Sequence, residues 1–172
     1  DREHQNVENR SMTLERAIED IAARRGTLMI PAFAMERTQD IIFEINEMMV
    51  ERRVPEMPVF VDSPLAIKVT DVFDKYRDYY SDEIRELYAR HPNLFRSRAL
   101  KPTPLVEESK AINDVPSPKV IIAGSGMMTG GRILHHLKRY LPDEHSSLLI
   151  VGYQARGSLG RAIVDGNREV KI

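Results

Sequence analysis

The segment from Gly124 to Arg132 has the residue types and spacing best suited to chemistry. The apolar run Val120-Ile121-Ile122-Ala123 leads directly into Gly124-Ser125-Gly126-Met127-Met128-Thr129-Gly130-Gly131-Arg132. Glycine permits positive φ angles and close approach to the backbone, and the amides of a turn that opens a helix attract anions. The segment therefore predicts a phosphate-binding turn. Its spacing matches neither the Gly-Lys-Ser/Thr ending of the nucleotide-hydrolase phosphate loop nor the dinucleotide pattern GxGxxG, so a tight turn needed only for packing is the open alternative.

Length and composition restrict the class of protein that carries this turn. The chain has 172 residues, no Cys, 30% charged residues and a formal net charge of −1. It is long enough for one well-packed domain, and the absence of Cys excludes disulfides and thiolate metal sites and suits the cytoplasm. The near-neutral charge lacks the basic signature of a free-standing nucleic-acid binder, so any polyanion site must be local. No apolar run reaches the roughly 18 residues of a membrane span, and no membrane partner is expected.

Apolar runs alternate with helical periodicity along the chain. Short runs bounded by turn residues predict strands, and apolar residues at i, i+3, i+4 and i+7 predict amphipathic helices. The pattern predicts an α/β fold, a three-layer, mostly parallel, doubly wound sheet flanked by helices, in a single domain over residues 1–172. The predicted strands are 27–33, 58–62, 95–100 (an edge strand), 119–123 and 148–153; the predicted helices are 14–22, 41–49, 63–76, 81–91, 105–113, 130–141 and 158–164.

The loops after the predicted strands form a recognisable set. Ligands of such sheets bind at the carboxyl ends of the strands, and these loops carry polar or glycine residues. In order, this set resembles the β-CASP domain, which marks the nucleic-acid-processing branch of the metallo-β-lactamase-fold hydrolases. The residues that carry the resemblance are Ile30-Pro31-Ala32-Phe33-Ala34 with Arg37 and Gln39, Asp62-Ser63-Pro64-Leu65-Ala66, Ala123-Gly124-Ser125-Gly126-Met127-Met128 with Gly130-Gly131-Arg132, and Gly152-Tyr153-Gln154 with Gly157 and Leu159-Gly160.

The resemblance implies a function that this chain does not perform alone. The branch includes the endonuclease of pre-mRNA 3′-end processing and bacterial and archaeal ribonucleases, and the glycine-rich segment of this chain looks closest to the bacterial members. Such enzymes hydrolyse RNA with two zinc ions, whose ligands lie in the metallo-β-lactamase domain of the same chain. We therefore expect an excised β-CASP domain with no catalytic residue and no metal ligand of its own, inactive alone, that clamps single-stranded RNA in a cytoplasmic enzyme.

The resemblance also implies which residues contact the RNA. The backbone around Ser125 and Gly126 is expected to hold a phosphate, and Arg37, Arg132 and Arg156 to pair with others. Phe33 or Tyr153 is expected to stack on a base, and the predicted contact set is Ser125, Gly126, Arg132, Arg37, Phe33, Gln154 and Arg156. For Arg37, a salt bridge to Glu36, Asp40 or Asp62 is the open alternative.

Two other functions fit the residues. One is a stand-alone, Rossmann-like module that binds a nucleotide or a phosphate, although no acidic ribose-binding residue follows the glycine-rich turn at a suitable distance. The other is a protein-interaction domain.

Three further residues have expected structural roles. Asp62 is expected to accept hydrogen bonds from the turn at residues 63–65. The adjacent His135 and His136 point about 100° apart on a helix, so one is expected at the surface and one in the core.

Overall fold

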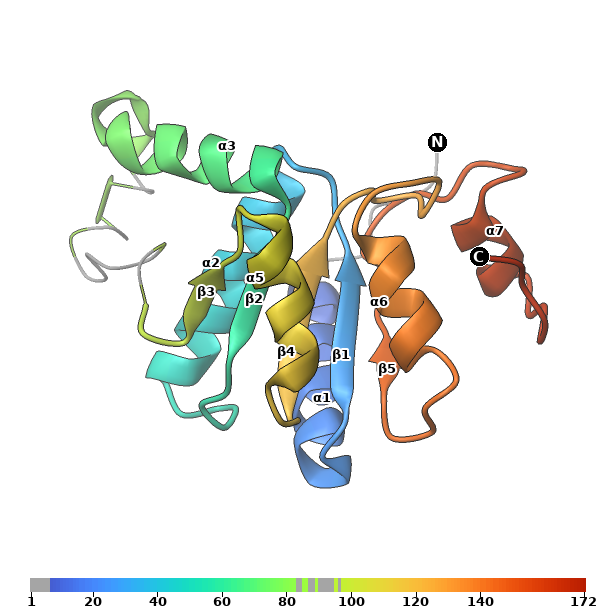
Figure 1. Cartoon of the computed structure of the whole chain (residues 1–172). Helices are drawn as coiled ribbons and strands as arrows, with labels where there is room; N and C mark the ends of the chain where they lie inside the picture. Colours follow the sequence, from blue (N-terminus) through green and yellow to red (C-terminus); the bar gives the residue numbers. More distant parts are fainter. Residues whose placement is uncertain (1–6, 83–84, 87–88, 90–94, 96) are drawn as a thin grey trace.

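The fold centres on a parallel β-sheet (Figure 1). The computed structural model describes residues 7–82, 85–86, 89, 95 and 97–172. Within them the sheet has five strands in the order β3-β2-β4-β1-β5, and every adjacent pair is parallel. The strands are β1 (Thr27–Pro31), β2 (Val59–Asp62), β3 (Leu100–Pro102), β4 (Lys119–Ala123) and β5 (Ser147–Leu148).

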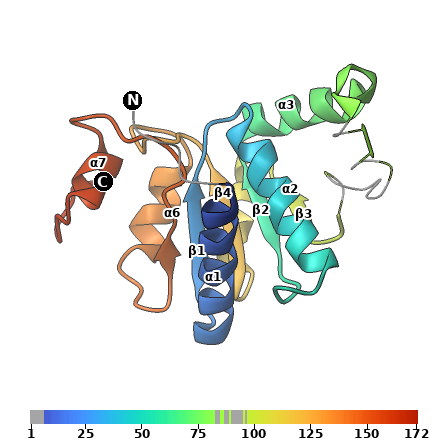
Figure 2. The ribbon, with the colours of Figure 1, turned by 180° about the vertical axis from the view of Figure 1, so that it is seen from behind.

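Helices cover both faces of the sheet. Helices α1 (Val7–Arg24) and α2 (Arg37–Val50) lie on one face (Figure 2), and α5 (Val106–Ala111), the 3-10 turn η2 (Ile112–Asp114) and α6 (Ile133–Tyr140) lie on the other (Figure 1). Helix α3 (Pro64–Lys75), followed by the 3-10 turn η1 (Arg77–Tyr79), crosses above the carboxyl ends of the strands, and α7 (Leu159–Val164) lies beyond α6 at the β5 edge. The predicted three-layer α/β fold is confirmed.

The central strands are buried on both faces because alternate side chains enter two different cores. Leu28 and Ile30 of β1 pack with α1 and α2, whereas Met29 between them packs with Leu137 of α6. The same alternation holds in β4, where Ile122 and Ile121 face opposite sides. Continuous apolar runs are typical of such parallel strands, which is why their positions are readable from the sequence.

Several boundaries differ from the prediction: α1, for example, begins at Val7 rather than at residue 14, and three other differences concern the sheet edges and α6. The edge strand pairs at Leu100–Pro102 rather than at 95–100, because its partners are Val59 to Val61 of β2. Only Ser147–Leu148 of the predicted strand 148–153 is a strand in the structure. Helix α6 begins at Ile133, not at residue 130, because Gly131 has φ +77° and cannot belong to a right-handed helix. The helix predicted at 81–91 falls largely outside the described residues.

We find no described helix that combines the length and the apolarity needed to cross a bilayer.

Candidate functional site

The loops after the five strands converge at one edge of the sheet, at the top of Figure 1. Parallel strands all end at the same edge, so these loops meet although they are far apart in sequence. This edge holds the glycine-rich turn, Phe33 after β1, Asp62 at the end of β2 and Tyr153 beyond β5.

The glycine-rich turn is held by its own hydrogen bonds. The amide of Ser125 donates to Gly130 O (3.1 Å), and the Ser125 hydroxyl accepts from the amide of Thr129 (3.1 Å). The amide of Ile133 donates to Gly124 O (3.0 Å), which joins the first residue of α6 to the end of β4. The predicted phosphate-binding amide of Ser125 therefore already has a partner, while its hydroxyl lies at the exposed side of the turn.

Gly126 forms the inner side of this turn. It is buried, and a Cβ added to it would lie 2.9 Å from ring carbons of Phe33, so only glycine lets the turn lie on that ring. Gln154 is also buried, and its Nε2 donates to Gly126 O (2.9 Å) and Gly152 O (3.2 Å). Phe33 retains 42% exposure. The structure thus brings Phe33, Gly126 and Gln154 into contact, with Gln154 joining the loop after β5 to the turn after β4.

The exposed side of the turn presents consecutive amides in front of α6. Among the described residues, no acceptor is bonded to the amides of Gly130, Gly131 and Arg132. Gly131 has positive φ and Arg132 is right-handed, a backbone pattern found in anion-binding nests. Gly131 is required here, since a Cβ would lie 2.4 Å from Gly124 O. The sequence indicated an anion-binding turn, but not that the amide of Ser125 is bonded within the turn while these three amides have no acceptor among the described residues.

Asp62 is the centre of a buried polar network beneath the turn. Its carboxylate is 0% exposed and accepts four hydrogen bonds. The donors are Thr103 Oγ1 (2.9 Å), Ser109 Oγ (2.6 Å), Arg132 Nη1 (2.8 Å) and His136 Nε2 (2.7 Å). The prediction that Asp62 accepts from the turn at 63–65 is wrong, because all four donors lie outside that turn. The Ser63 hydroxyl instead caps α3 by accepting from the amide of Ala66 (3.3 Å).

These hydrogen bonds also determine the charge state of Asp62. Burial alone would raise its pKa, but the bonds from His136, Ser109, Arg132 and Thr103 outweigh burial and lower the pKa to about 2. The carboxylate is therefore ionised at neutral pH. Its hydrogen bonds join the end of β2 to Ser109 of α5 and His136 of α6, and the bond from Arg132 holds the residue just before α6.

Arg132 is part of this network. Its guanidinium donates to Asp62 and to the backbone carbonyls of Thr103 (2.6 Å) and Pro104 (3.0 Å), and its side chain is 19% exposed. Three protein acceptors thus take hydrogen bonds from the guanidinium, so phosphate contact by Arg132 stays a prediction. Of the two adjacent histidines, His135 is exposed and His136 is buried, as expected.

Arg37 begins α2 and lies 3.7 Å from Asp40, an ion pair in which both side chains are partly exposed. Such pairs are weak in water. The ion pair confirms the predicted alternative of a salt bridge to Asp40. Because the pair is weak, it leaves Arg37 able to bind an anion.

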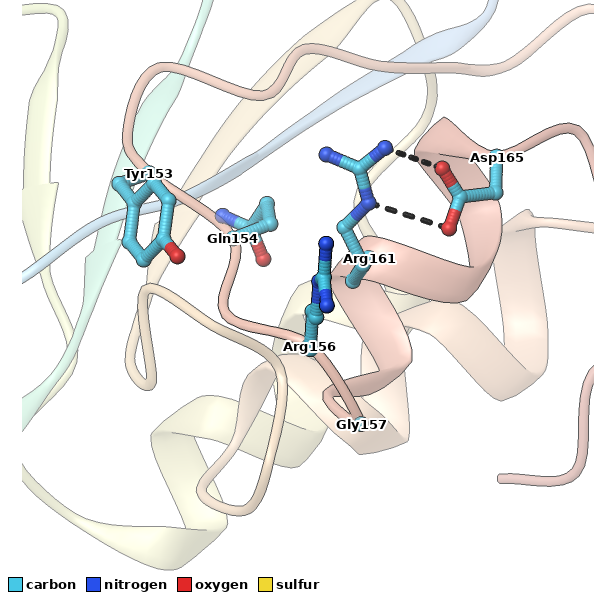
Figure 3. A pocket seen from close by; sticks show the side chains of 6 residues that line it. All are labelled: Tyr153, Gln154, Arg156, Gly157, Arg161 and Asp165. Carbon is cyan, nitrogen blue, oxygen red and sulfur yellow. Dashed lines mark hydrogen bonds and ion pairs between the residues drawn. The ribbon is translucent and has the colours of Figure 1, made fainter.

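A pocket of about 630 Å³ lies beside the turn, in the segment after β5 (Figure 3). Arg161 donates through both Nε and Nη2 to the carboxylate of Asp165. In the view of Figure 3, Arg156 and Arg161 lie on one side of the pocket and the Tyr153 ring lies on the other. Tyr153, Gln154, Arg156, Gly157, Arg161 and Asp165 line the pocket. Arg156 is thus exposed at this pocket, and its contact with a phosphate stays a prediction; Tyr153 is 74% exposed.

The described residues do not fit a metal centre. Outside residues 1–6 and the gaps between 83 and 96, no three His, Asp or Glu side chains lie close enough to hold an ion. The imidazole of His136 is hydrogen-bonded to Asp62 inside the core. No step of a reaction can therefore be assigned to a metal bound by these residues.

Comparison with known proteins identifies the class. A model of the Beta-Casp domain matches residues 38–163, well over half of the chain, so the chain belongs to the Beta-Casp family. It is 39% identical over 155 residues to ribonuclease TTHA0252 of Thermus thermophilus, covering 90% of this chain and 36% of that protein. It is also 33% identical over 160 residues to the transcription termination factor FttA of Methanosarcina mazei (92% and 25%) and 32% identical over 163 residues to an RNase J-like protein of Methanocaldococcus jannaschii (92% and 37%). The chain spans a quarter to just over a third of the length of these relatives.

Proposed function

We propose that this chain is the RNA-binding clamp of a metallo-β-lactamase-fold ribonuclease, an enzyme that hydrolyses RNA phosphodiester bonds. The observation that carries the proposal is the grouping, at the carboxyl edge, of the open amides of Gly130 to Arg132 with the exposed ring of Phe33 and the exposed cation of Arg156. Amides and arginines bind phosphates, and aromatic rings stack on unpaired bases. Single-stranded RNA offers both groups. The names of two relatives, one a ribonuclease and one an RNase J-like protein, support the same substrate.

We assign the predicted contacts different parts within this clamp. The Ser125 hydroxyl, Phe33, Arg37 and Arg156 face the RNA, together with the amides before α6. Gly126, Gln154 and Arg132 hold the turn in shape, because Gly126 and Gln154 are buried and Arg132 is bonded to the buried Asp62. Each phosphate contact should weaken as salt is added.

We further propose that this domain works within a longer cytoplasmic protein. The two zinc ions that supply hydroxide and stabilise the attacked phosphate in such an enzyme would be bound by residues outside this chain, in a metallo-β-lactamase domain. That domain would form the opposite wall of the RNA cleft. The chain alone would then bind no stoichiometric zinc and cleave no RNA.

The test compares this chain with the complete gene product that contains it. Both are assayed for zinc content and for hydrolysis of a labelled single-stranded oligoribonucleotide. We expect zinc and cleavage in the complete product and neither in the chain. If the chain alone retains stoichiometric zinc and degrades the oligoribonucleotide, the clamp assignment fails; if the complete product does not cleave RNA, the ribonuclease assignment fails.

A further inference from the structure

We propose that the pocket after β5 is a binding subsite for one nucleotide of a single-stranded RNA, with Tyr153 stacking on the base and Arg156 binding the adjacent phosphate. This inference rests on the proposed function and adds a discrete site to it. The pocket volume of about 630 Å³ lies within the range of small-molecule sites, and its lining combines one exposed aromatic ring with charged side chains.

The charges in the pocket leave one cation available. Asp165 is the acidic residue of the lining, and Arg161 donates two hydrogen bonds to it. The hydrogen bond from Arg161 lowers the pKa of Asp165, and the positive charges of Arg161 and Arg156 lower it further, so the carboxylate stays ionised. Among the residues that the structure describes, the carboxylate accepts its hydrogen bonds from Arg161 alone. Arg156 is exposed, and within the described part of the chain no acidic side chain forms an ion pair with it. Two arginines against one carboxylate give the pocket a net positive charge, carried by Arg156.

The aromatic side of the pocket is equally available. Tyr153 is 74% exposed, and its ring faces the pocket across from Arg156 (Figure 3). An aromatic ring so exposed leaves most of its face open to water, and a base stacked on the ring would cover it. A ring on one side and a guanidinium on the other match the base and the phosphate of one nucleotide.

The neighbouring structure favours a strand over a free mononucleotide. Gln154, the residue after Tyr153, holds Gly126 of the glycine-rich turn through its Nε2 (2.9 Å), and the amide of Gly160 donates to Met127 O (3.4 Å). The loop that lines the pocket is therefore bonded to the glycine-rich turn, which carries the open amides of Gly130 to Arg132. A ligand that binds both needs more than one phosphate, as an RNA strand has and a nucleoside monophosphate does not.

The experiment measures binding of the complete gene product to an oligoribonucleotide that carries 2-aminopurine at successive positions, with EDTA present to prevent hydrolysis. The variants are Tyr153→Leu and Arg156→Gln. Tyr79→Leu, at an 86% exposed tyrosine of η1, and Arg16→Gln, at an exposed arginine of α1, are the matched controls. Arg156→Lys tests whether charge alone restores binding.

We expect quenching of 2-aminopurine at one position of the strand. Tyr153→Leu should abolish this quenching and lower the affinity about 5- to 140-fold. Arg156→Gln should lower the slope of log Kobs against log salt by about 0.7, the value for one phosphate contact on a single strand. Arg156→Lys should restore that slope, and both controls should bind as the unchanged protein does. Tyr153 and Arg156 are exposed, so neither substitution should change the unfolding curve.

Two results would overturn the subsite. One is normal RNA binding and cleavage with quenching and salt slope unchanged in both variants, which leaves the ribonuclease proposal standing. The other is a 2-aminopurine ribonucleoside monophosphate that binds as tightly as the strand, which would indicate a mononucleotide site. Loss of RNA binding by the unchanged complete protein would refute the proposed function and the subsite together.

Discussion

The substitution Asp62→Asn should destabilise the chain more than its small size suggests. Asp62 is fully buried and accepts from Thr103, Ser109, Arg132 and His136 at 2.6–2.9 Å. An asparagine keeps one acceptor oxygen, but its amide nitrogen must face two of these donors, and the negative charge opposite Arg132 is lost. Charge-assisted hydrogen bonds of buried groups contribute about 1.5–3 kcal/mol each, and partial compensation by the asparagine oxygen leaves an expected loss of about 2–4 kcal/mol.

The same carboxylate predicts how the loss depends on pH. The pKa of Asp62 is lowered from 3.8 to about 2 by its four donors, against the opposing effect of burial. A group with a lowered pKa in the folded state contributes its full stabilisation above its unfolded pKa and loses it as the pH falls through its folded pKa. The difference between the two values corresponds to at most about 2.5 kcal/mol. The unchanged chain should therefore lose this advantage over Asp62→Asn between about pH 4 and pH 2.

Urea unfolding followed by circular dichroism, at several pH values from 7 to 2.5, measures both effects. Asp40→Asn is the matched control, since Asp40 is half-exposed and 3.7 Å from Arg37, and it should change stability by less than about 1 kcal/mol. A loss below about 1 kcal/mol for Asp62→Asn at pH 7, together with a difference from the unchanged chain that stays constant down to pH 2.5, would refute the reasoning.

Three further substitutions test the edge that carries the site. Gly131→Ala should lower the free energy of unfolding by about 2–4 kcal/mol, because Gly131 has positive φ and an added Cβ would lie 2.4 Å from a backbone oxygen. Its control is Gly130→Ala, where an added Cβ meets nothing within 4 Å, and the loss in the same urea titration should be less than about 1 kcal/mol. Gln154→Leu removes both hydrogen bonds of the side-chain amide and should speed amide hydrogen exchange around Gly126; unchanged exchange there would contradict its role as the link between two loops. Ser63→Ala removes the cap of α3 and should lower the free energy of unfolding by about 1 kcal/mol, a loss that Ser63→Asp should largely restore.

The strands show which part of a fold can be predicted from residue types. The runs 27–33, 58–62 and 119–123 were located from the sequence because strands β1, β2 and β4 are buried on both faces, and burial is what an apolar run reports. The run 148–153 is just as apolar, and Leu149, Ile150 and Val151 do pack against the two cores. Only Ser147–Leu148 is paired as a strand, opposite Leu28 and Met29, although the neighbouring β1 continues to Pro31. Apolar character therefore predicted burial there, but not how far the chain stays paired with β1.

The site illustrates a different limit. The glycine-rich turn is local, so its position between β4 and α6 was readable from consecutive residues. The pairing of Asp62 with His136 joins residues 74 positions apart and depends on how α6 is placed over β2. A signal was nonetheless present, because an aspartate that ends an apolar strand is buried and must find donors. His136 lies next to Leu137 and three residues after Ile133, which are both fully buried on α6. Its position on the buried side of α6 makes His136 a donor that could be predicted for Asp62.

The buried carboxylate and the open amides depend on each other. In the proposed clamp, the open amides of Gly130, Gly131 and Arg132 would bind a phosphate only while α6 starts at a fixed place over the sheet edge. Asp62 is hydrogen-bonded there to Arg132 and His136. The Asp62 carboxylate thus holds the start of α6 through its own hydrogen bonds, while the amides of Gly130, Gly131 and Arg132 have no acceptor among the described residues. If RNA binds there, Asp62→Asn should weaken binding without changing its salt slope, since the substitution displaces the amides and removes no contact to phosphate. A reduced slope in that variant would instead indicate that Arg132 contacts a phosphate in the unchanged protein and loses that contact when Asp62 no longer holds its guanidinium in place.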